Sequence, residues 1–173
     1  MLLTLLLSSE KSFNEIKVSE PSSIVLYLEN PLKSVVPEHL YDFTKGLCLK
    51  YGVPFEVFVA LISVESNWSN YCRSYNKKSD TWDCGLGQIN DRNFELFSKA
   101  YLDGKPLIWY HAKDNLTVSV RHFSEVLHYL KGNVRETLVA YNVGLNGRLN
   151  PRVHKIGLKY ANRIYTRLQE IMS

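Results

Sequence analysis

A chain of 173 residues with 45% hydrophobic and 12% aromatic residues is long enough for one compact domain with an apolar core. Its formal net charge is only +4, and no helix-turn-helix, finger or RNP pattern is present, which argues against nucleic acid as a partner. The three cysteines form no Cys-x-x-Cys or Cys-x-x-His pair, which argues against a zinc site. We therefore expect a single domain without a metal or another cofactor.

The first 36 residues are predicted to lie apart from the functional domain. An apolar run over residues 1–7 follows no lysine or arginine; it is too short to span a membrane and resembles the core of a signal peptide whose basic beginning is missing. Residues 24–28 are also apolar and are compatible with a strand or a short helix. We expect residues 1–36 to be a leader or an arm of an exported protein, and residues 37–173 to be the functional domain, without a membrane-spanning segment.

Two helices are predicted next, and each begins at a proline. Pro37 opens the first helix and Gly52 ends it. We expect Cys48, near the end of this helix, to be a small buried hydrophobic residue. The second helix begins at Pro54, extends through Trp68 and is apolar nearly all round, so we expect it at the centre of the core. The apolar stripe of the first helix consists of Leu40, Phe43, Leu47 and Tyr51.

Glu65 lies in the second half of this apolar helix. Leu61 and Ile62 precede it by one turn and Trp68 follows it by one turn, so these apolar side chains share its face. We therefore expect apolar groups around the carboxyl group. Burial disfavours the ionised form and raises the pKa, which is what a carboxylic acid needs to donate a proton near neutral pH.

A polar segment rich in tyrosine and lysine follows, between Cys72 and Cys84. A disulfide between these two cysteines would close a short loop, stabilise the fold by roughly 3 kcal/mol on the chain-entropy model, and fit an oxidising periplasm or exterior. Two free thiols in a reduced protein are the alternative, and both remain open. The end of this segment, around residues 81–89, is compatible with a small β element.

Two helices are predicted after this segment. Asp91 is a good N-cap for a helix over residues 93–101, which the turn residues at 103–106 end. Asp114 is expected to cap the next helix, which extends to the stop at Gly132. Its apolar residues recur with a period of 3.6 and are Leu116, Val120, Phe123, Leu127 and Leu130.

The C-terminal part is predicted to hold a short helix over residues 134–142, a loop over 147–151 and an amphipathic helix over 153–172. The charged residues after 145 are predominantly basic. This basic face is interpreted as a solvated helix surface, with contact to a polyanion such as an acidic cell-wall polymer as the alternative. The basic residues are Arg148, Arg152, Lys155, Lys159, Arg163 and Arg167.

Four motifs occur in a fixed order along residues 37–168. They are Lys50-Tyr51-Gly52-Val53-Pro54 leading into Val64-Glu65-Ser66-Asn67-Trp68, Gly85-Leu86-Gly87-Gln88-Ile89-Asn90, Asn115-Leu116, and Ala140-Tyr141-Asn142-Val143-Gly144 with Tyr160 beyond. In this order they resemble the lysozyme-fold lytic transglycosylases of the soluble-transglycosylase (SLT) type, similar to the small enzymes that accompany secretion and conjugation systems. The resemblance implies a mainly α, lysozyme-like (α+β) single domain with a substrate cleft and at most a small β element around 81–89.

The resemblance also implies a reaction. Such enzymes cleave the β-1,4 bond between N-acetylmuramic acid and N-acetylglucosamine without water. The residue that matches the family's single acid/base is Glu65, which would protonate the bridging oxygen and then take a proton from the C6 hydroxyl to give a 1,6-anhydro product. The residues that the resemblance implies for substrate binding are Ser66, Gln88, Asn90, Tyr141, Asn142, Tyr160, Gly85 and Gly87.

These binding residues have different expected contributions. The amides of Gln88 and Asn90 are suited to sugar hydroxyl and acetamido groups, and Gly85 and Gly87 would let the backbone approach the sugar. Gly87 departs from the family pattern, which has methionine there, so an apolar contact beneath a bound sugar is missing. Tyr141, judged by residue type alone, would be a core aromatic.

Two other functions remain open. The segment that begins at Asp83 also resembles the Asp-Tyr-Gly-Ile-x-Gln-Ile-Asn segment of animal-type lysozymes, so Asp83 would be the second carboxylate of a muramidase that hydrolyses the same bond with Glu65. A non-catalytic peptidoglycan-binding component is the other alternative, against which the apolar surroundings of Glu65 argue. Peptidoglycan glycan strands are the implied substrate, and an envelope-spanning secretion or conjugation machine is a further implied partner. We expect a monomer in the periplasm or cell envelope.

Overall fold

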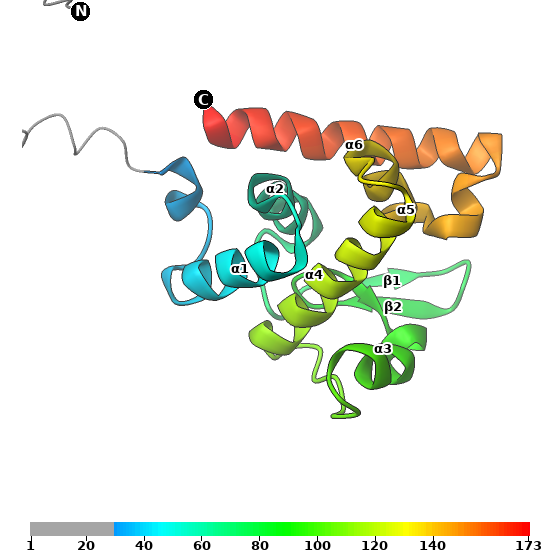
Figure 1. Cartoon of the computed structure of the whole chain (residues 1–173). Helices are drawn as coiled ribbons and strands as arrows, with labels where there is room; N and C mark the ends of the chain where they lie inside the picture. Colours follow the sequence, from blue (N-terminus) through cyan, green and yellow to red (C-terminus); the bar gives the residue numbers. More distant parts are fainter. Residues whose placement is uncertain (1–29) are drawn as a thin grey trace, which may run out of the picture.

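The computed structural model describes residues 30–173 (Figure 1). The apolar stretch at 24–28, for which a strand or short helix was predicted, lies outside these residues. Residues 31–34 form a short 3-10 helix, η2 (Pro31–Ser34), whose Leu32 is buried. Leu32 and Val36 both belong to the main apolar core. The apolar core therefore includes residues that precede Pro37.

The two proline-initiated helices form as predicted. Helix α1 (Glu38–Tyr51) follows Pro37 and ends at Gly52, whose φ of 66° is favourable for glycine. Helix α2 (Phe55–Ser66) follows Pro54 and is almost completely buried. Its predicted extension through Trp68 is wrong, because Asn67 and Trp68 have positive φ values of 48° and 61°.

A three-stranded antiparallel sheet follows, in the order β1 (Arg73–Asn76), β2 (Thr81–Cys84) and β3 (Ile89–Asn90). The β element predicted around residues 81–89 is therefore confirmed in strands β2 and β3. Strand β1 was not predicted, since all four of its residues are exposed and show no alternation of apolar and polar side chains.

The next two helices are present, but the predicted caps are wrong. Helix α3 (Phe94–Tyr101) follows a 3-10 turn, η3 (Asp91–Asn93), and the side chain that caps this turn is Asn90, which accepts from the Arg92 N–H at 3.2 Å. Helix α4 (Ala112–Tyr129) begins after His111. Asp114 lies inside its first turn, where a negative charge is favourable, and is 2.9 Å from His111 Nδ1.

The last two helices are longer than predicted. Helix α5 (Val134–Arg148) contains a kink at Gly144, whose φ of 76° and ψ of 160° are not helical. Helix α6 (Pro151–Met172) begins after Asn150, whose side chain accepts from two backbone N–H groups of the first turn. The predicted loop at 147–151 therefore shrinks to the residues between Arg148 and Pro151.

Helices α1, α4, α5 and α6 lie around α2, and the sheet and α3 lie to one side of them (Figure 1). Helix α6 packs along α5 and α2, while α1 packs along α4. A smaller apolar cluster joins β3 and α3 to α4. The mainly α fold with a small sheet is thus confirmed. Within residues 30–173, no helix is both long enough and apolar enough to span a membrane.

Two helical glycines give a matched test of this packing. A Cβ added at Gly157 of α6 would lie 2.6 Å from Val139 Cγ1 of α5, whereas one added at Gly46 of α1 would meet no atom within 4 Å. We expect Gly157→Ala to lower the free energy of unfolding by about 1–3 kcal/mol through overpacking, and Gly46→Ala to raise it by about 0.5–1 kcal/mol. Urea unfolding of both variants measures these changes. Equal effects would show that α5 and α6 do not approach this closely.

Candidate active site

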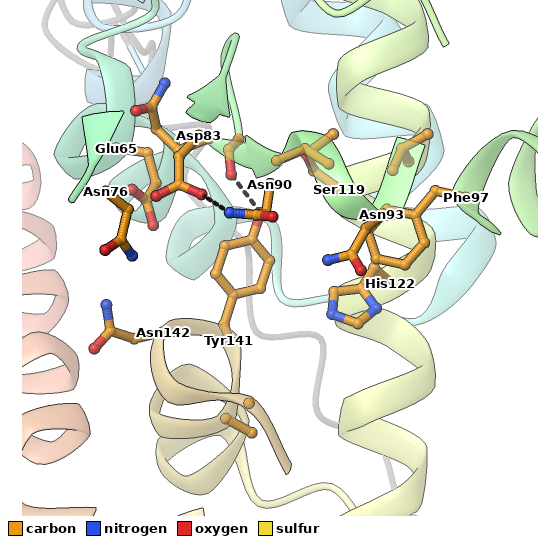
Figure 2. A pocket seen from close by; sticks show the side chains of 16 residues that line it. Glu65, Asn76, Asp83, Asn90, Asn93, Phe97, Ser119, His122, Tyr141 and Asn142 are labelled. Atoms are coloured by element: carbon orange, nitrogen blue, oxygen red, sulfur yellow. Dashed lines mark hydrogen bonds between the residues drawn. The ribbon is translucent and has the colours of Figure 1, made fainter. Parts of the chain in front are cut away.

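A cleft of about 330 Å³ brings together residues from α2, the sheet, α4 and α5. Figure 2 shows Glu65 and Asp83 near one end, His122 and Phe97 at the other, and Tyr141 between them. Gln88, Asn90 and Asn142 also line it. Most of the residues predicted for the site therefore meet in one space, although they come from distant parts of the chain.

The carboxyl group of Glu65 is largely shielded from water, although it borders the cleft. Glu65 is the last residue but one of α2, and the helix ends there because Asn67 adopts the left-handed conformation. The Tyr160 hydroxyl, from α6, donates a hydrogen bond to Glu65 Oε1. Burial raises the pKa of Glu65 to about 7; the Tyr160 hydrogen bond and Arg163 lower it, and the charge of Asp83 raises it. The predicted increase in the pKa of Glu65 is confirmed.

Asp83 is held by a neighbouring amide on the sheet. Asp83 and Asn90 are paired across strands β2 and β3, and Asn90 Nδ2 donates to Asp83 Oδ1 at 2.8 Å and to Thr81 Oγ1 at 2.9 Å (Figure 2). Because Asn90 Oδ1 also accepts from the Arg92 N–H, the amide of Asn90 is largely occupied by the protein. Asn90 therefore positions Asp83 in the cleft.

The turn between β2 and β3 is fixed by side-chain hydrogen bonds. Gln88 has a φ of 47°, and its Nε2 donates to the carbonyl oxygens of Cys72 at 3.1 Å and Gly85 at 2.9 Å. The Tyr141 hydroxyl donates to the Gly87 carbonyl at 2.9 Å. Gln88 and Tyr141 thus line the cleft and also hold its wall in place.

Asn115 of α4 anchors the same turn from behind. It is fully buried, its Oδ1 accepts from the Gly87 N–H at 2.8 Å, and its Nδ2 donates to the carbonyls of Cys84 at 3.1 Å and Trp109 at 3.0 Å. Three backbone groups from two loops are therefore satisfied by one side chain. Asn115 belongs to one of the four sequence motifs, but its place behind the turn cannot be read from that motif.

The two glycines of the turn are required for packing. A Cβ at Gly85 would lie 2.2 Å from Asn115 Nδ2, and one at Gly87 would lie 2.0 Å from Ser119 Oγ. Gly85 is not among the residues that line the cleft, and its close approach to Asn115 is a packing reason for a glycine here; its approach to a sugar stays a prediction. Gly87 does line the cleft, and Ser119 lies next to the space that a side chain at position 87 would take.

Two other predicted contacts are placed differently. Ser66 is buried, its hydroxyl donates to the Ile62 carbonyl at 3.3 Å, and it does not line the cleft. Cys72 and Cys84 are free thiols in the structure, which is the second of the two alternatives left open from the sequence. Arg73 pairs with Cys84 across the sheet, which offsets the two cysteines by one residue and directs their side chains to opposite faces.

Several cleft residues were not predicted from the sequence. None of these residues is part of a motif identified in the sequence. They are Asn76, Asn93, Phe97, Ser119 and His122. Burial lowers the pKa of His122, which favours its neutral form. Within residues 30–173, no group of three or more His, Cys, Asp or Glu side chains is arranged to bind a metal ion.

The sequence of this chain matches the model of one protein family. The model of the family described as "Transglycosylase SLT domain" matches residues 44–164, which is well over half of the chain and includes Glu65, Gln88, Asn115 and Tyr160. No curated protein matches the chain.

Removal of the Asn115 amide tests its anchoring contacts. We expect Asn115→Leu to lower the free energy of unfolding by about 3–5 kcal/mol, because three buried backbone groups lose their partners. Asn162→Leu is the control, since Asn162 is exposed and its side chain bonds only to Arg135 within the described chain. Chemical unfolding measures both variants. A loss of similar size in the two would contradict the assigned contacts.

The pKa of Glu65 predicts a pH-dependent change in stability. The pKa of Glu65 is about 7 in the folded state and 4.5 in the unfolded state. The folded state therefore keeps the proton up to a higher pH than the unfolded state does. The stability of the wild type relative to Glu65→Gln should be highest below pH 4.5 and fall by at most about 3 kcal/mol as the pH rises through 7. Urea unfolding between pH 4 and 8 measures this difference.

A second carboxylate provides the control for this measurement. Glu95 is exposed, and its pKa is lowered by its hydrogen bond with Lys99. The stability of the wild type relative to Glu95→Gln should therefore not fall as the pH rises from 4 to 8. A difference between wild type and Glu65→Gln that does not vary with pH would contradict the burial of the Glu65 carboxyl group.

Proposed function

This chain belongs to the transglycosylase SLT family and is a peptidoglycan lytic transglycosylase, and on that premise we propose that Glu65 alone provides its acid and its base. The observation that carries this proposal is the position of the carboxyl group. It lies in the cleft, burial raises its pKa to about 7, and Tyr160 donates a hydrogen bond to one of its oxygens. Near neutral pH both its acid and its base forms are therefore accessible.

The proposed reaction needs two proton transfers. Glu65 first protonates the oxygen that bridges N-acetylmuramic acid and N-acetylglucosamine, and the bond from C1 to that oxygen breaks. The N-acetyl group of the muramyl sugar stabilises the positive charge that develops at C1. The Glu65 carboxylate then removes the proton from the C6 hydroxyl, whose oxygen bonds to C1. The product is a 1,6-anhydro sugar, no water is consumed, and Glu65 ends protonated.

The hydrogen bond from Tyr160 supports one carboxyl group in both roles. It restrains Glu65 Oε1, while Glu65 Oε2 has no hydrogen-bond partner among residues 30–173 and is available to the substrate. Tyr160 approaches from α6, which packs against α2. The orientation of the acid is therefore set by helix packing as well as by its own helix.

The remaining cleft residues are proposed to hold the glycan strand. Asn142 is exposed at the cleft and carries an amide that can pair with acetamido or hydroxyl groups, while the ring of Tyr141 provides an apolar wall. Gln88 Nε2 is already bonded to two backbone carbonyls. The side-chain oxygen of Gln88 is therefore the group that it offers to the glycan strand. Ser66 has no part in this proposal, because its hydroxyl faces its own helix.

Asp83 gives the second candidate function. It lines the same cleft as Glu65, and its charge raises the pKa of Glu65, so a retaining hydrolase with Asp83 as nucleophile is the alternative. In the transglycosylase proposal, the Asp83 carboxylate instead stabilises the positive charge at C1 without forming a bond. The Asn90 hydrogen bond holds the Asp83 carboxyl group in place in either case.

The proposed location follows from the substrate. Peptidoglycan lies outside the cytoplasm, so we propose that the protein acts in the periplasm or cell envelope. The catalytic domain is proposed to comprise residues 37–173 together with Leu32 and Val36, whose side chains belong to its core. The association with a secretion or conjugation machine is proposed from the resemblance alone.

Mass spectrometry of the muropeptides released from sacculi tests the reaction. We expect products lighter by one water, with 1,6-anhydromuramic ends. Glu65→Gln should lower the release by at least about 10²- to 10⁴-fold, because general acid and base catalysis are lost. Asp83→Asn should still release anhydro products, although more slowly. Reducing ends from the wild type would establish the hydrolase, and unchanged release by Glu65→Gln would overturn the assignment of Glu65.

A further inference from the structure

The ribbon of β1 and β2 carries different side chains on its two faces. Side chains alternate along a strand, so Asn76 and Asp83 share the face that lines the cleft (Figure 2). Tyr75 and Trp82, which pair directly across the strands, project from the opposite face together with Arg73. The outer face of the ribbon is therefore aromatic, although it is not part of the cleft.

These side chains continue into a larger aromatic surface. The ring centres of Tyr75 and Trp82 are 5.0 Å apart, and the Arg73 guanidinium lies 4.4 Å from the Trp82 ring and 5.2 Å from the Trp109 ring. Trp109 contacts Tyr110 at 5.3 Å, and Tyr110 stacks on Tyr71 at 6.2 Å with an angle of 15° between the planes. We name this surface the aromatic strip, and its members are Tyr71, Arg73, Tyr75, Trp82, Trp109 and Tyr110.

The aromatic strip is open to solvent. Tyr71 is 74% exposed, Tyr110 49%, Tyr75 48% and Trp82 38%. These rings pack mainly on one another and on Arg73, so they contribute little to either apolar core. Contiguous exposed aromatic groups mark a site of interaction, because leaving them in water is unfavourable.

We propose that the aromatic strip binds a peptidoglycan glycan strand outside the catalytic cleft. The inference rests on peptidoglycan being the substrate of this family. Flat aromatic rings fit the apolar C–H face of a pyranose, and the tyrosine hydroxyls and Arg73 provide hydrogen bonds beside them. Because the rings already hold one another in place, little side-chain entropy is lost on binding.

The charges around the strip agree with this ligand. Lys77 and Lys78 follow β1 and are exposed, and Arg73 lies within the strip. Asp80, the one acidic residue from 73 to 80, accepts a hydrogen bond from Tyr75. This basic rim suits the carboxylates of the stem peptides that the glycan strand carries.

A second attachment point would assist an enzyme whose substrate is an insoluble polymer. Binding of one part of a strand to the aromatic strip raises the effective concentration of neighbouring bonds at the cleft, which lies on the other face of the same ribbon. The strip is thus expected to matter for sacculi and not for short soluble glycans, which cannot occupy both surfaces.

Cosedimentation with purified sacculi tests the aromatic strip. The Glu65→Gln chain is compared with the same chain carrying Tyr71→Ala, Trp82→Ala and Tyr110→Ala, and Tyr129→Ala is the control because Tyr129 is 67% exposed at the end of α4. We expect the triple variant to raise the apparent Kd by about tenfold or more and Tyr129→Ala to leave it unchanged. An unchanged Kd in the triple variant would overturn the proposal and leave a protein partner as the occupant.

Turnover and a milder variant separate binding from other effects. With Glu65 intact, the triple variant should cleave a soluble tetrasaccharide at the wild-type rate but sacculi more slowly. Tyr71→Ala alone, which removes a ring that has no hydrogen bond within residues 30–173, should also weaken cosedimentation without lowering the melting temperature. Normal cosedimentation by a folded Tyr71→Ala chain, or an equal loss of turnover on both substrates, would overturn the proposal. If Glu65→Gln still cleaved peptidoglycan, this result would contradict the assignment of Glu65 as the acid and base. It would not contradict binding by the aromatic strip.

Discussion

The arrangement of the site depends on the burial of one carboxyl group, that of Glu65. Desolvation raises the pKa of this group, and the Tyr160 hydrogen bond and the Arg163 charge oppose that effect. The result is a pKa of about 7, at which a single group can donate and accept a proton. Helix α6, which supplies both Tyr160 and Arg163, therefore has an electrostatic role as well as a packing role.

The opposite wall of the cleft depends on polar contacts instead of apolar burial. Asn115 bonds three backbone groups, Gln88 bonds two more, and Tyr141 bonds the Gly87 carbonyl. Such networks are rigid when every member is paired and costly when one is lost. They leave no room for side chains at Gly85 and Gly87, so the glycines and the network require one another.

The ribbon of β1 and β2 connects the two surfaces described above. Its inner face contributes Asp83 to the cleft, and its outer face contributes Trp82 to the aromatic strip. A shift of one residue in strand register would exchange the two faces. The same pairing therefore decides which side chains are near Glu65, which are exposed, and why Cys72 and Cys84 do not meet.

The sequence alone determined the helices and the environment of Glu65, because prolines, glycines and apolar periodicity act over a few residues. It also indicated the family, through motifs whose order is itself a property of the chain. The tertiary structure decided the contact between Tyr160 and Glu65, which are 95 residues apart, and the contacts of Asn115 with Gly87 and Cys84, which are 28 and 31 residues away. These features depend on which distant groups become neighbours, and local spacing carries no information about that.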